Sequence, residues 1–158
     1  MKQDTTKLDK IDKHILKELQ VRADIPNKEL AEIVGLSPSA CLRRVSHLKN
    51  KGVIRRIVAL VDPAHLDRRL TAIITVRLVR HGPEYRRDFL KRIRNEPTVS
   101  QCYMVSGDTS CVLIMHVADM EEYTELADRL FHEDKNVATF TTHLVMNTIK
   151  METAIALE

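Results

Sequence analysis

A short turn between two capped helices is the feature that most restricts how this chain can fold. In IPNKELAEIVG, Asn27 is placed to cap a helix and Gly35 to end it. The following LSPSACLRRVSHLKNKG starts a second helix, with Ser37 as N-cap, Pro38 at the first helical position and Gly52 as the end signal. Two helices joined by a short turn that contains glycine are typical of a helix-turn-helix unit.

Another helix and an extended segment complete the N-terminal region. The stretch LDKIDKHILKELQ carries its apolar residues on one helical stripe. The β-branched segment VIRRIVALVDP predicts an extended strand and linker that closes at Pro63. We therefore expect a winged or plain helix-turn-helix domain over residues 1–60, a linker over 61–69 and a second domain over 70–158.

Strands and helices alternate in the second half of the chain. LTAIITVRLV has apolar residues at period two and predicts a strand, as do TVSQCYMV, CVLIMHVA and NVATFTTHLVMNTIK, with METAIALE as a weaker terminal strand. PEYRRDFLKRIRNE and MEEYTELADRLFHED have helical spacing. The order βαββαβ indicates a ferredoxin-like (ACT-like) sandwich, in which two helices cover one face of an antiparallel sheet. The fold class predicted for the whole chain is α+β with two domains.

Positive charge is concentrated in the N-terminal part of the chain. Residues 1–62 hold 13 Lys and Arg against 8 Asp and Glu, whereas residues 63–158 hold 12 against 14. Between residues 37 and 56 there are six cations and no acid. A local field of this kind favours a polyanion such as nucleic acid. A basic face that is merely solvated is the alternative, although acids normally intersperse such a face.

The helix that begins at Ser37 offers side chains for contact with double-stranded DNA. Its apolar residues Leu42, Val45 and Leu48 are expected to face the core of the small domain. On the other side, small residues allow a close approach to the major groove, and two arginines can reach guanine edges or phosphates. The later cations are better placed for backbone contacts. The predicted DNA-binding residues are Ser37, Ser39, Ala40, Arg43, Arg44, His47, Lys49, Lys51 and Arg55.

Two alternatives stay open for this helix. One of the two arginines, Arg43 or Arg44, can instead be a structural partner of Asp9 or Asp12 in the first helix. His47 is as well explained by a solvated residue as by a base or phosphate contact.

The N-terminal half resembles a known family. LDKIDKHILKELQ and NKELAEIVGLSPSACLRRVSHLKNKGVIRR are similar to the DNA-binding domain of the Lrp/AsnC (feast/famine) transcription regulators. The ALVDP segment and the βαββαβ half also fit the family. The resemblance implies dimers that assemble further, often into octamers, and control by an amino acid or a related metabolite. A twofold dimer would place two recognition helices on pseudo-palindromic half-sites.

The loop in VSGDTSCVL departs from the pattern of that family. The family usually has Gly-x-x-Asp here, lining an amino-acid pocket between dimers; Gly107 matches, but Ser110 stands in place of the aspartate. On a late strand the family often has two threonines, of which Thr142 matches the second and Phe140 replaces the first. The resemblance thus implies carboxylate capture by loop amides with altered ligand specificity, or loss of amino-acid sensing. The candidate effector-binding residues are Gly107, Asp108, Thr109, Ser110, Phe140 and Thr142.

A plain hairpin turn, in which Ser110 makes only local bonds, is the alternative for this loop. Catalysis is not expected, because Ser110 and Cys111 have no histidine nearby in the sequence and a strand-turn-strand setting is wrong for a nucleophile elbow. A pair of Cys111 with His116 or His143 on a neighbouring strand stays open as the alternative. The three scattered cysteines and seven unclustered histidines predict neither a disulfide framework nor a metal site, and no cofactor is expected.

Other classes of protein fit the sequence less well. Aromatic residues make up 4% of the chain, too few for a sheet that stacks RNA bases. With no apolar run near 18 residues and no secretory segment, we expect a cytoplasmic, nucleoid-associated protein without a membrane partner. The predicted function is a sequence-specific transcriptional regulator, and the alternative is an effector-independent DNA-organising protein of the same fold.

Overall fold

The chain forms two compact units. The computed structural model describes residues 7–80 and 82–157. One unit extends to Leu60 and also includes the residues from Lys150 onward, and the other covers Val61–Ile149. The terminal residues, which the sequence placed with the second domain, thus group with the first unit. None of the helices in the described ranges is long and apolar enough to span a lipid bilayer.

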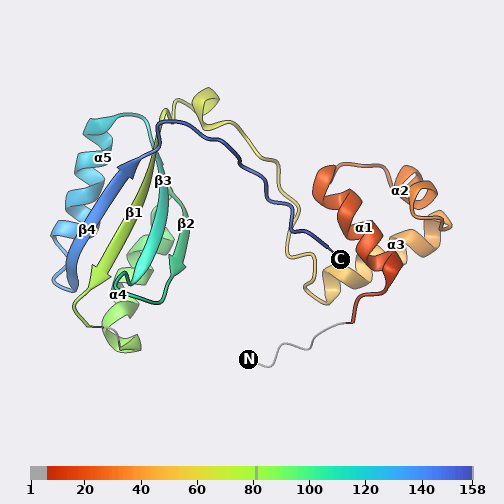
Figure 1. Ribbon diagram of the computed structural model, residues 1–158, viewed down its shortest axis with the longest axis horizontal. Coiled ribbons are helices and arrows are strands. Elements are labelled where there is room, and N and C mark those ends of the chain that lie inside the picture. Colours follow the sequence, from red (N-terminus) through yellow and green to blue (C-terminus); the bar gives the residue numbers. More distant parts are fainter. Residues whose placement is uncertain (1–6, 81, 158) are drawn as a thin grey trace. The chain divides into compact units, whose positions relative to one another are not determined.

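Three helices make up most of the first unit: α1 (Lys10–Val21), α2 (Asn27–Ile33) and α3 (Pro38–Asn50) (Figure 1). The turn between α2 and α3 follows the sequence signals closely. Gly35 has a φ of +70°, and the Ala40 N–H donates to the Ser37 side chain at the start of α3. This arrangement is the predicted helix-turn-helix.

Asn27 is not the N-cap of α2, as the sequence predicted. Pro26 occupies that position without a side-chain cap, and Asn27 is the first helical residue. Its side-chain amide instead donates to the Pro38 carbonyl at 2.9 Å. The Asn27 side chain therefore links the start of α2 to the start of α3 and does not cap α2.

The core of the first unit uses a different face of α3 from the one predicted. Cys41 and Leu48 are fully buried, whereas Leu42 is 57% exposed. The buried stripe of α3 therefore passes through Cys41, Val45 and Leu48, and the prediction that Leu42 faces the core is wrong. Spacings of four and three follow the 3.6-residue helical repeat more closely than two successive threes. Helices α1 and α2 contribute the remaining buried residues, which are Ile15, Leu16, Leu30, Ala31 and Val34.

Two predicted strands do not form in the described residues. The segment after α3 makes no ladder up to the short 3₁₀ turn Pro63–Leu66, and its apolar side chains such as Val58 and Leu60 are exposed. The terminal METAIALE is also without strand structure through Leu157. Its Ile155 backbone instead bonds at both polar atoms to the Gln20 side-chain amide of α1. β-branched composition favours an extended backbone, but a strand also needs a partner.

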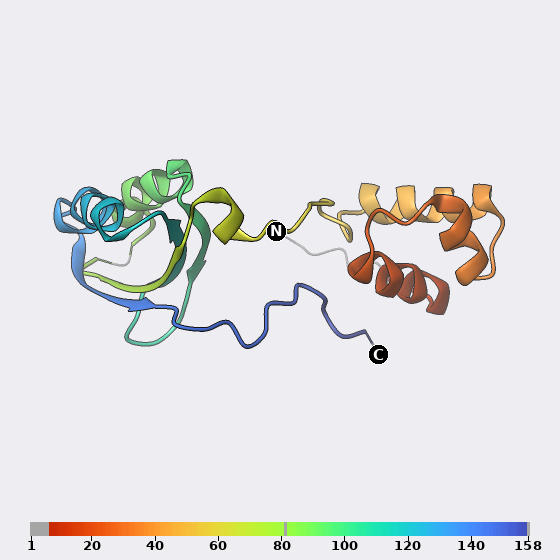
Figure 2. The same ribbon diagram turned by 90° about the horizontal axis from the view of Figure 1, so that it is seen from above.

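The second unit has the predicted βαββαβ order. Its elements are β1 (Leu70–Leu78), α4 (Pro83–Asn95), β2 (Val99–Met104), β3 (Cys111–Val117), α5 (Met120–Ala127) and β4 (Val137–Leu144). A π-helical turn, Asp128–His132, extends α5. The strands form one antiparallel sheet in the order β2-β3-β1-β4. Both helices lie on the same side of this sheet (Figure 2), so the ferredoxin-like architecture is confirmed.

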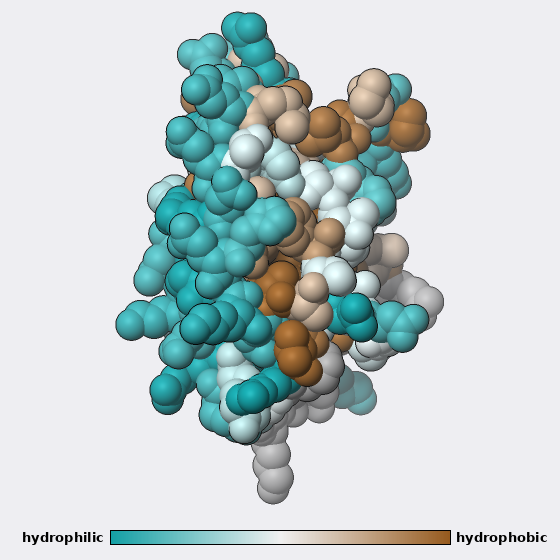
Figure 3. Space-filling model, turned by 90° about the vertical axis from the view of Figure 1, so that its left-hand side faces the viewer, coloured by the Kyte–Doolittle hydropathy of each residue, from teal (hydrophilic) through white to brown (hydrophobic). Residues whose placement is uncertain are grey.

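The two faces of this sheet differ in burial. Alternate residues of β1 and β3, among them Ile74, Val76 and Leu113, are fully buried beneath Phe89 and other helical side chains. On the opposite face, Ile73, Val112 and Ile114 are only partly buried. Seen from the left-hand side of Figure 1, the surface carries a band of apolar side chains within a broad hydrophilic area (Figure 3).

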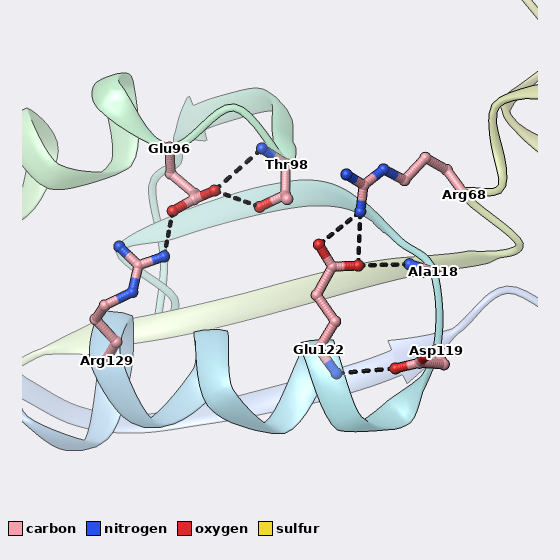
Figure 4. Close-up of polar contacts among 7 residues, drawn as sticks. All are labelled: Arg68, Glu96, Thr98, Ala118, Asp119, Glu122 and Arg129. Atoms are coloured by element: carbon pink, nitrogen blue, oxygen red, sulfur yellow. Dashed lines mark hydrogen bonds and ion pairs between the residues drawn. The ribbon is translucent and has the colours of Figure 1, made fainter.

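Two carboxylates tie the ends of the helices to neighbouring segments (Figure 4). Glu96 accepts hydrogen bonds from the Thr98 hydroxyl at 2.8 Å and from Arg129 at 2.6 Å. Glu122, in the first turn of α5, accepts hydrogen bonds from Arg68 at both carboxylate oxygens, at 2.5 and 2.6 Å. The Ala118 N–H also donates to Glu122, at 2.7 Å. These contacts fix the segment before β1 against the start of α5.

Glu122→Gln is expected to destabilise the second unit at neutral pH and to have little effect in acid. The Ala118 N–H and then Arg68 lower the pKa of Glu122 below its ordinary value of 4.5. A lowered folded-state pKa adds stability above the ordinary pKa, and this stability is lost as pH falls through the folded value. Urea unfolding of both proteins between pH 7 and about pH 3 tests this. A difference that did not shrink in acid would contradict it.

Candidate DNA-binding surface and ligand loop

Most of the predicted DNA-binding residues, on α3 and next to its two ends, are exposed to solvent. Seven of them are exposed, whereas Ala40 and Arg44 are half-buried. Ser39, Arg43 and His47 follow one another at intervals of four and so share one face of the helix. Within residues 7–80 and 82–157, the Arg43 guanidinium makes no hydrogen bond or ion pair. A free cation on the exposed face of α3 can reach a base edge or a phosphate.

Arg44 is held inside its own unit. Its Nη1 donates to Asp9 Oδ2 at 2.7 Å and to Asp12 Oδ1 at 2.8 Å. Asp9 and Asp12 also form a capping box at the start of α1, and the Asp12 side chain is 14% exposed. The Asp12 N–H and then Arg44 lower the pKa of Asp9. The ion-pair alternative therefore describes Arg44 in this structure, where it joins α3 to α1.

Arg44→Ala is expected to lower the free energy of unfolding of the first unit by up to about 1 kcal/mol, because a partly exposed ion-pair network contributes little more. A double-mutant cycle with Asp12→Ala measures the coupling directly. Arg43→Ala is the matched control and should leave the unfolding free energy unchanged. Purely additive effects of Arg44→Ala and Asp12→Ala would contradict the structural role.

Sequence reasoning missed Leu42 as a surface residue. Its exposed side chain stands next to Arg43 on the outer side of α3. An apolar group in that place can contact a thymine methyl in the major groove. The signal that could have shown this is Cys41, which comes directly before Leu42, because α3 buries Cys41 in its place.

The loop between β2 and β3 borders a small hollow. The hollow measures about 220 Å³ and reaches from the loop to α4. Gly107 in this loop has a φ of +109°, a conformation that favours glycine. The lining residues are Leu78, Arg86, Met104, Val105, Ser106, Gly107, Thr109 and Ser110. Asp108 is exposed beside it.

Arg86 is a lining residue that the sequence did not indicate. It comes from the first half of α4, and in the described part of the chain its guanidinium has no acidic partner. The cation adds positive charge to a hollow already bordered by loop amides. A carboxylate is the ligand group that such a combination suits best.

Ser110 is engaged in the fold itself. It is 5% exposed, and its Oγ accepts a hydrogen bond from the Leu78 N–H at 3.0 Å. The Ser110 N–H donates to the Val76 carbonyl at 2.8 Å. These bonds connect the loop to the end of β1, so Ser110 has a structural role, although through a distant strand and not through the local bonds that the hairpin alternative expected.

Ser110→Ala is expected to destabilise the second unit by about 1–3 kcal/mol, since the Leu78 N–H would lose its partner in a buried place. Ser106→Ala, in the same loop but exposed, should have a much smaller effect. Urea unfolding of the two variants gives the comparison. Equal stabilities would mean that the Ser110 hydroxyl does not support the strand end.

Phe140 and Thr142 do not reach this hollow within one chain. They lie on β4 opposite Val76 and Ile74, on the helix-covered face of the sheet. Thr142 bonds to the Tyr123 hydroxyl, and the Phe140 ring lies 4.9 Å from Phe131, centroid to centroid. A pocket that combines all six predicted effector residues therefore does not exist in a single described chain.

A helix-turn-helix unit that exposes an arginine on its second helix, in one chain with a ferredoxin-like unit, is typical of a two-domain DNA-binding protein. Comparison with known families narrows this class. The Lrp/AsnC ligand binding domain matches residues 71–155, and a winged helix-turn-helix DNA-binding domain matches residues 8–55. The chain belongs to the Lrp/AsnC family of transcriptional regulators.

Similar proteins cover nearly the whole chain. An uncharacterized HTH-type transcriptional regulator of Haemophilus influenzae is 37% identical over 95% of this chain and 89% of its own length. The leucine-responsive regulatory protein of Escherichia coli is 34% identical over 96% and 92%. A transcriptional regulator of Neisseria meningitidis, solved as a complex with L-Met, superposes with a TM-score of 0.89 at 33% identity, covering 95% of this chain and 97% of that one.

Proposed function

We propose that α3 is the recognition helix and that Arg43 is its main reader of base edges. The observation that carries this is the contrast between two adjacent arginines: Arg44 is engaged by Asp9 and Asp12, whereas Arg43 is exposed without an acidic partner in the described chain. Ser39, Leu42 and His47 border it on the same side of the helix. Lys49, Lys51 and Arg55 contact phosphates and supply affinity that depends on salt.

The protein acts as a dimer, and dimers assemble further. The support is the sheet face opposite the helices, where Ile73, Val112 and Ile114 remain partly exposed in one chain. A second copy covers this apolar face more favourably than water does. Twofold symmetry then presents two α3 helices to a pseudo-palindromic DNA site.

The ligand is an amino acid or a related carboxylate, bound at the Gly107 loop. Arg86 and the loop amides receive the carboxylate, and the similar N. meningitidis protein bound to L-Met supports this class of ligand. Ser110 is a poor acceptor for an α-amino group, because it is buried and already bonded to Leu78. The side chain that completes the pocket comes from another copy of the chain.

Calorimetric titration of the full-length protein with each of the twenty amino acids tests the ligand proposal. We expect at least one carboxylate ligand to bind, and Arg86→Ala to weaken its binding while the protein stays folded. Arg87→Ala, a neighbouring exposed cation on α4 that does not line the hollow, is the matched control. If no ligand changes either heat or DNA affinity, the effector-independent DNA-organising protein is the better description.

A further inference from the structure

Two cysteines lie near each other on the β2–β3 hairpin, which carries the ligand loop (residues 105–110). Cys102 lies on β2 opposite Leu113, and Cys111 lies on β3 opposite Met104, so the two cysteines are diagonal neighbours on one face of the sheet. The Cys111 thiol is close enough to Cys102 to influence its ionisation. The two side chains are therefore neighbours on the sheet, although they are nine positions apart in the sequence.

The pair is reached from solvent on one side only. Cys102 is exposed, whereas Cys111 is buried in the core beneath it. Cys102 lines a hollow of about 350 Å³ between β2 and α4, together with Arg94, Gln101 and Met104. A small polar oxidant can enter this space and meet Cys102 first.

The surroundings favour the reactive form of Cys102. The neighbouring Cys111 thiol, and in second place the positive charge of Arg94, lower the pKa of the Cys102 thiol to about 7. The proximity of Cys102, together with burial, raises the pKa of Cys111. About half of Cys102 is therefore in the thiolate form near pH 7, and Cys111 remains a thiol. The thiolate is the nucleophilic form of cysteine.

We propose that Cys102 is a modification site for hydroperoxides and that Cys111 resolves the product to an intrachain disulfide. The Cys102 thiolate attacks the terminal peroxide oxygen, the O–O bond breaks, and the departing alkoxide or hydroxide takes a proton. This leaves a sulfenic acid on Cys102. The Cys111 sulfur then attacks the Cys102 sulfur, and the sulfenic hydroxyl leaves with the Cys111 proton as water. Overall two thiols are oxidised and one hydroperoxide is reduced to an alcohol, or to water from hydrogen peroxide, with a further water released.

Formation of the disulfide between Cys102 and Cys111 requires a small movement of β2. Diagonal neighbours in a regular antiparallel ladder stand about 7–8 Å apart, which exceeds the usual Cα separation of a disulfide. β2 can move because it is an edge strand bonded only to β3, and its register already shifts between Val99 and Gln101. Strain in the bond also makes it easier to reduce, so the modification is reversible.

Oxidation would also stiffen the ligand loop. Residues 105–110 connect β2 directly to Cys111, so a bond between the two strands fixes both ends of the loop. An effect on ligand affinity rests on the proposed function, whereas the thiol chemistry does not.

Intact-mass measurement of the reduced full-length protein after stoichiometric hydrogen peroxide tests the chemistry. We expect the loss of two hydrogen atoms and a peptide linked through Cys102 and Cys111. Cys111→Ala should instead trap a sulfenic acid on Cys102 that dimedone captures, and Cys102→Ser should abolish both products. Cys41→Ala is the control, since Cys41 is buried in the other unit and its variant should still form the disulfide.

Wild-type protein supplies a second measurement that does not depend on how the variants fold. Iodoacetamide should alkylate Cys102 about ten-fold or more faster than Cys41 at neutral pH, with a rate that rises through pH 7. Equal rates for the two cysteines would overturn the proposal. So would peroxide products limited to links between chains, or a wild-type sulfenic acid that never converts to the disulfide. Ligand titration of the oxidised protein then reports on the loop separately.

Discussion

Arg43→Ala is expected to lower the affinity for specific duplex DNA by about 5- to 150-fold, or about 1–3 kcal/mol, if the guanidinium contacts a base edge. The physical reason is the loss of two directed hydrogen bonds to guanine in a site that has excluded water. The folded protein loses nothing, because Arg43 has no partner in the described chain. Fluorescence anisotropy with a labelled operator, beside thermal melts, gives both quantities.

The control for this prediction is Lys51→Ala on the same basic segment. A phosphate contact should weaken all sequences alike and reduce the salt slope by about one unit. Arg43→Ala should change the preference between sequences instead. Unchanged operator affinity of Arg43→Ala would show that the reading side chain lies elsewhere.

Leu48→Ala is expected to destabilise the first unit by about 2–5 kcal/mol, the range for removing a fully buried leucine side chain. A unit of this size has little stability in reserve, so much of the helix-turn-helix would unfold and DNA binding would be lost. The second unit has a separate core and should remain folded. Urea unfolding followed with one probe for each unit measures the two stabilities, and fluorescence anisotropy measures the loss of DNA binding.

Leu42→Ala is the matched substitution on the same helix. Leu42 is 57% exposed, so its removal should cost little stability. A reduction in DNA affinity without unfolding would place Leu42 against the bases. If Leu42→Ala were as destabilising as Leu48→Ala, the buried stripe of α3 would differ from the one described.

Local signals account for the parts of the fold that the sequence predicted well. Ser37, Pro38 and Gly35 act within a turn of their own position, and the period-two pattern of β1 depends on the next residue but one. Residues 53–63 and the METAIALE segment were predicted as strands but form none, because strand formation requires a distant partner. The role of Asn27 was predicted wrongly for the same reason, because its hydrogen bond to the Pro38 carbonyl depends on how α2 and α3 pack against each other.

The candidate sites show the same division between local and distant causes. The exposure of Arg43 followed from helical periodicity, whereas the choice of Arg44 for the ion pair depended on residues more than 30 positions away. The bonds of Ser110 to β1 and the position of Arg86 beside Gly107 follow from the packing of distant segments. The position of Cys102 as a diagonal neighbour of Cys111 depends on the strand register.

The most direct test of the account is selection of bound duplexes from a randomised DNA library by the full-length protein. We expect enrichment of a pseudo-palindrome whose half-sites lie about one helical turn, or a multiple of it, apart. The Arg43→Ala protein should lose preference at one symmetric pair of positions. Binding without any enriched sequence, or enrichment unaffected by Arg43→Ala, would contradict the assignment of α3 as the reader.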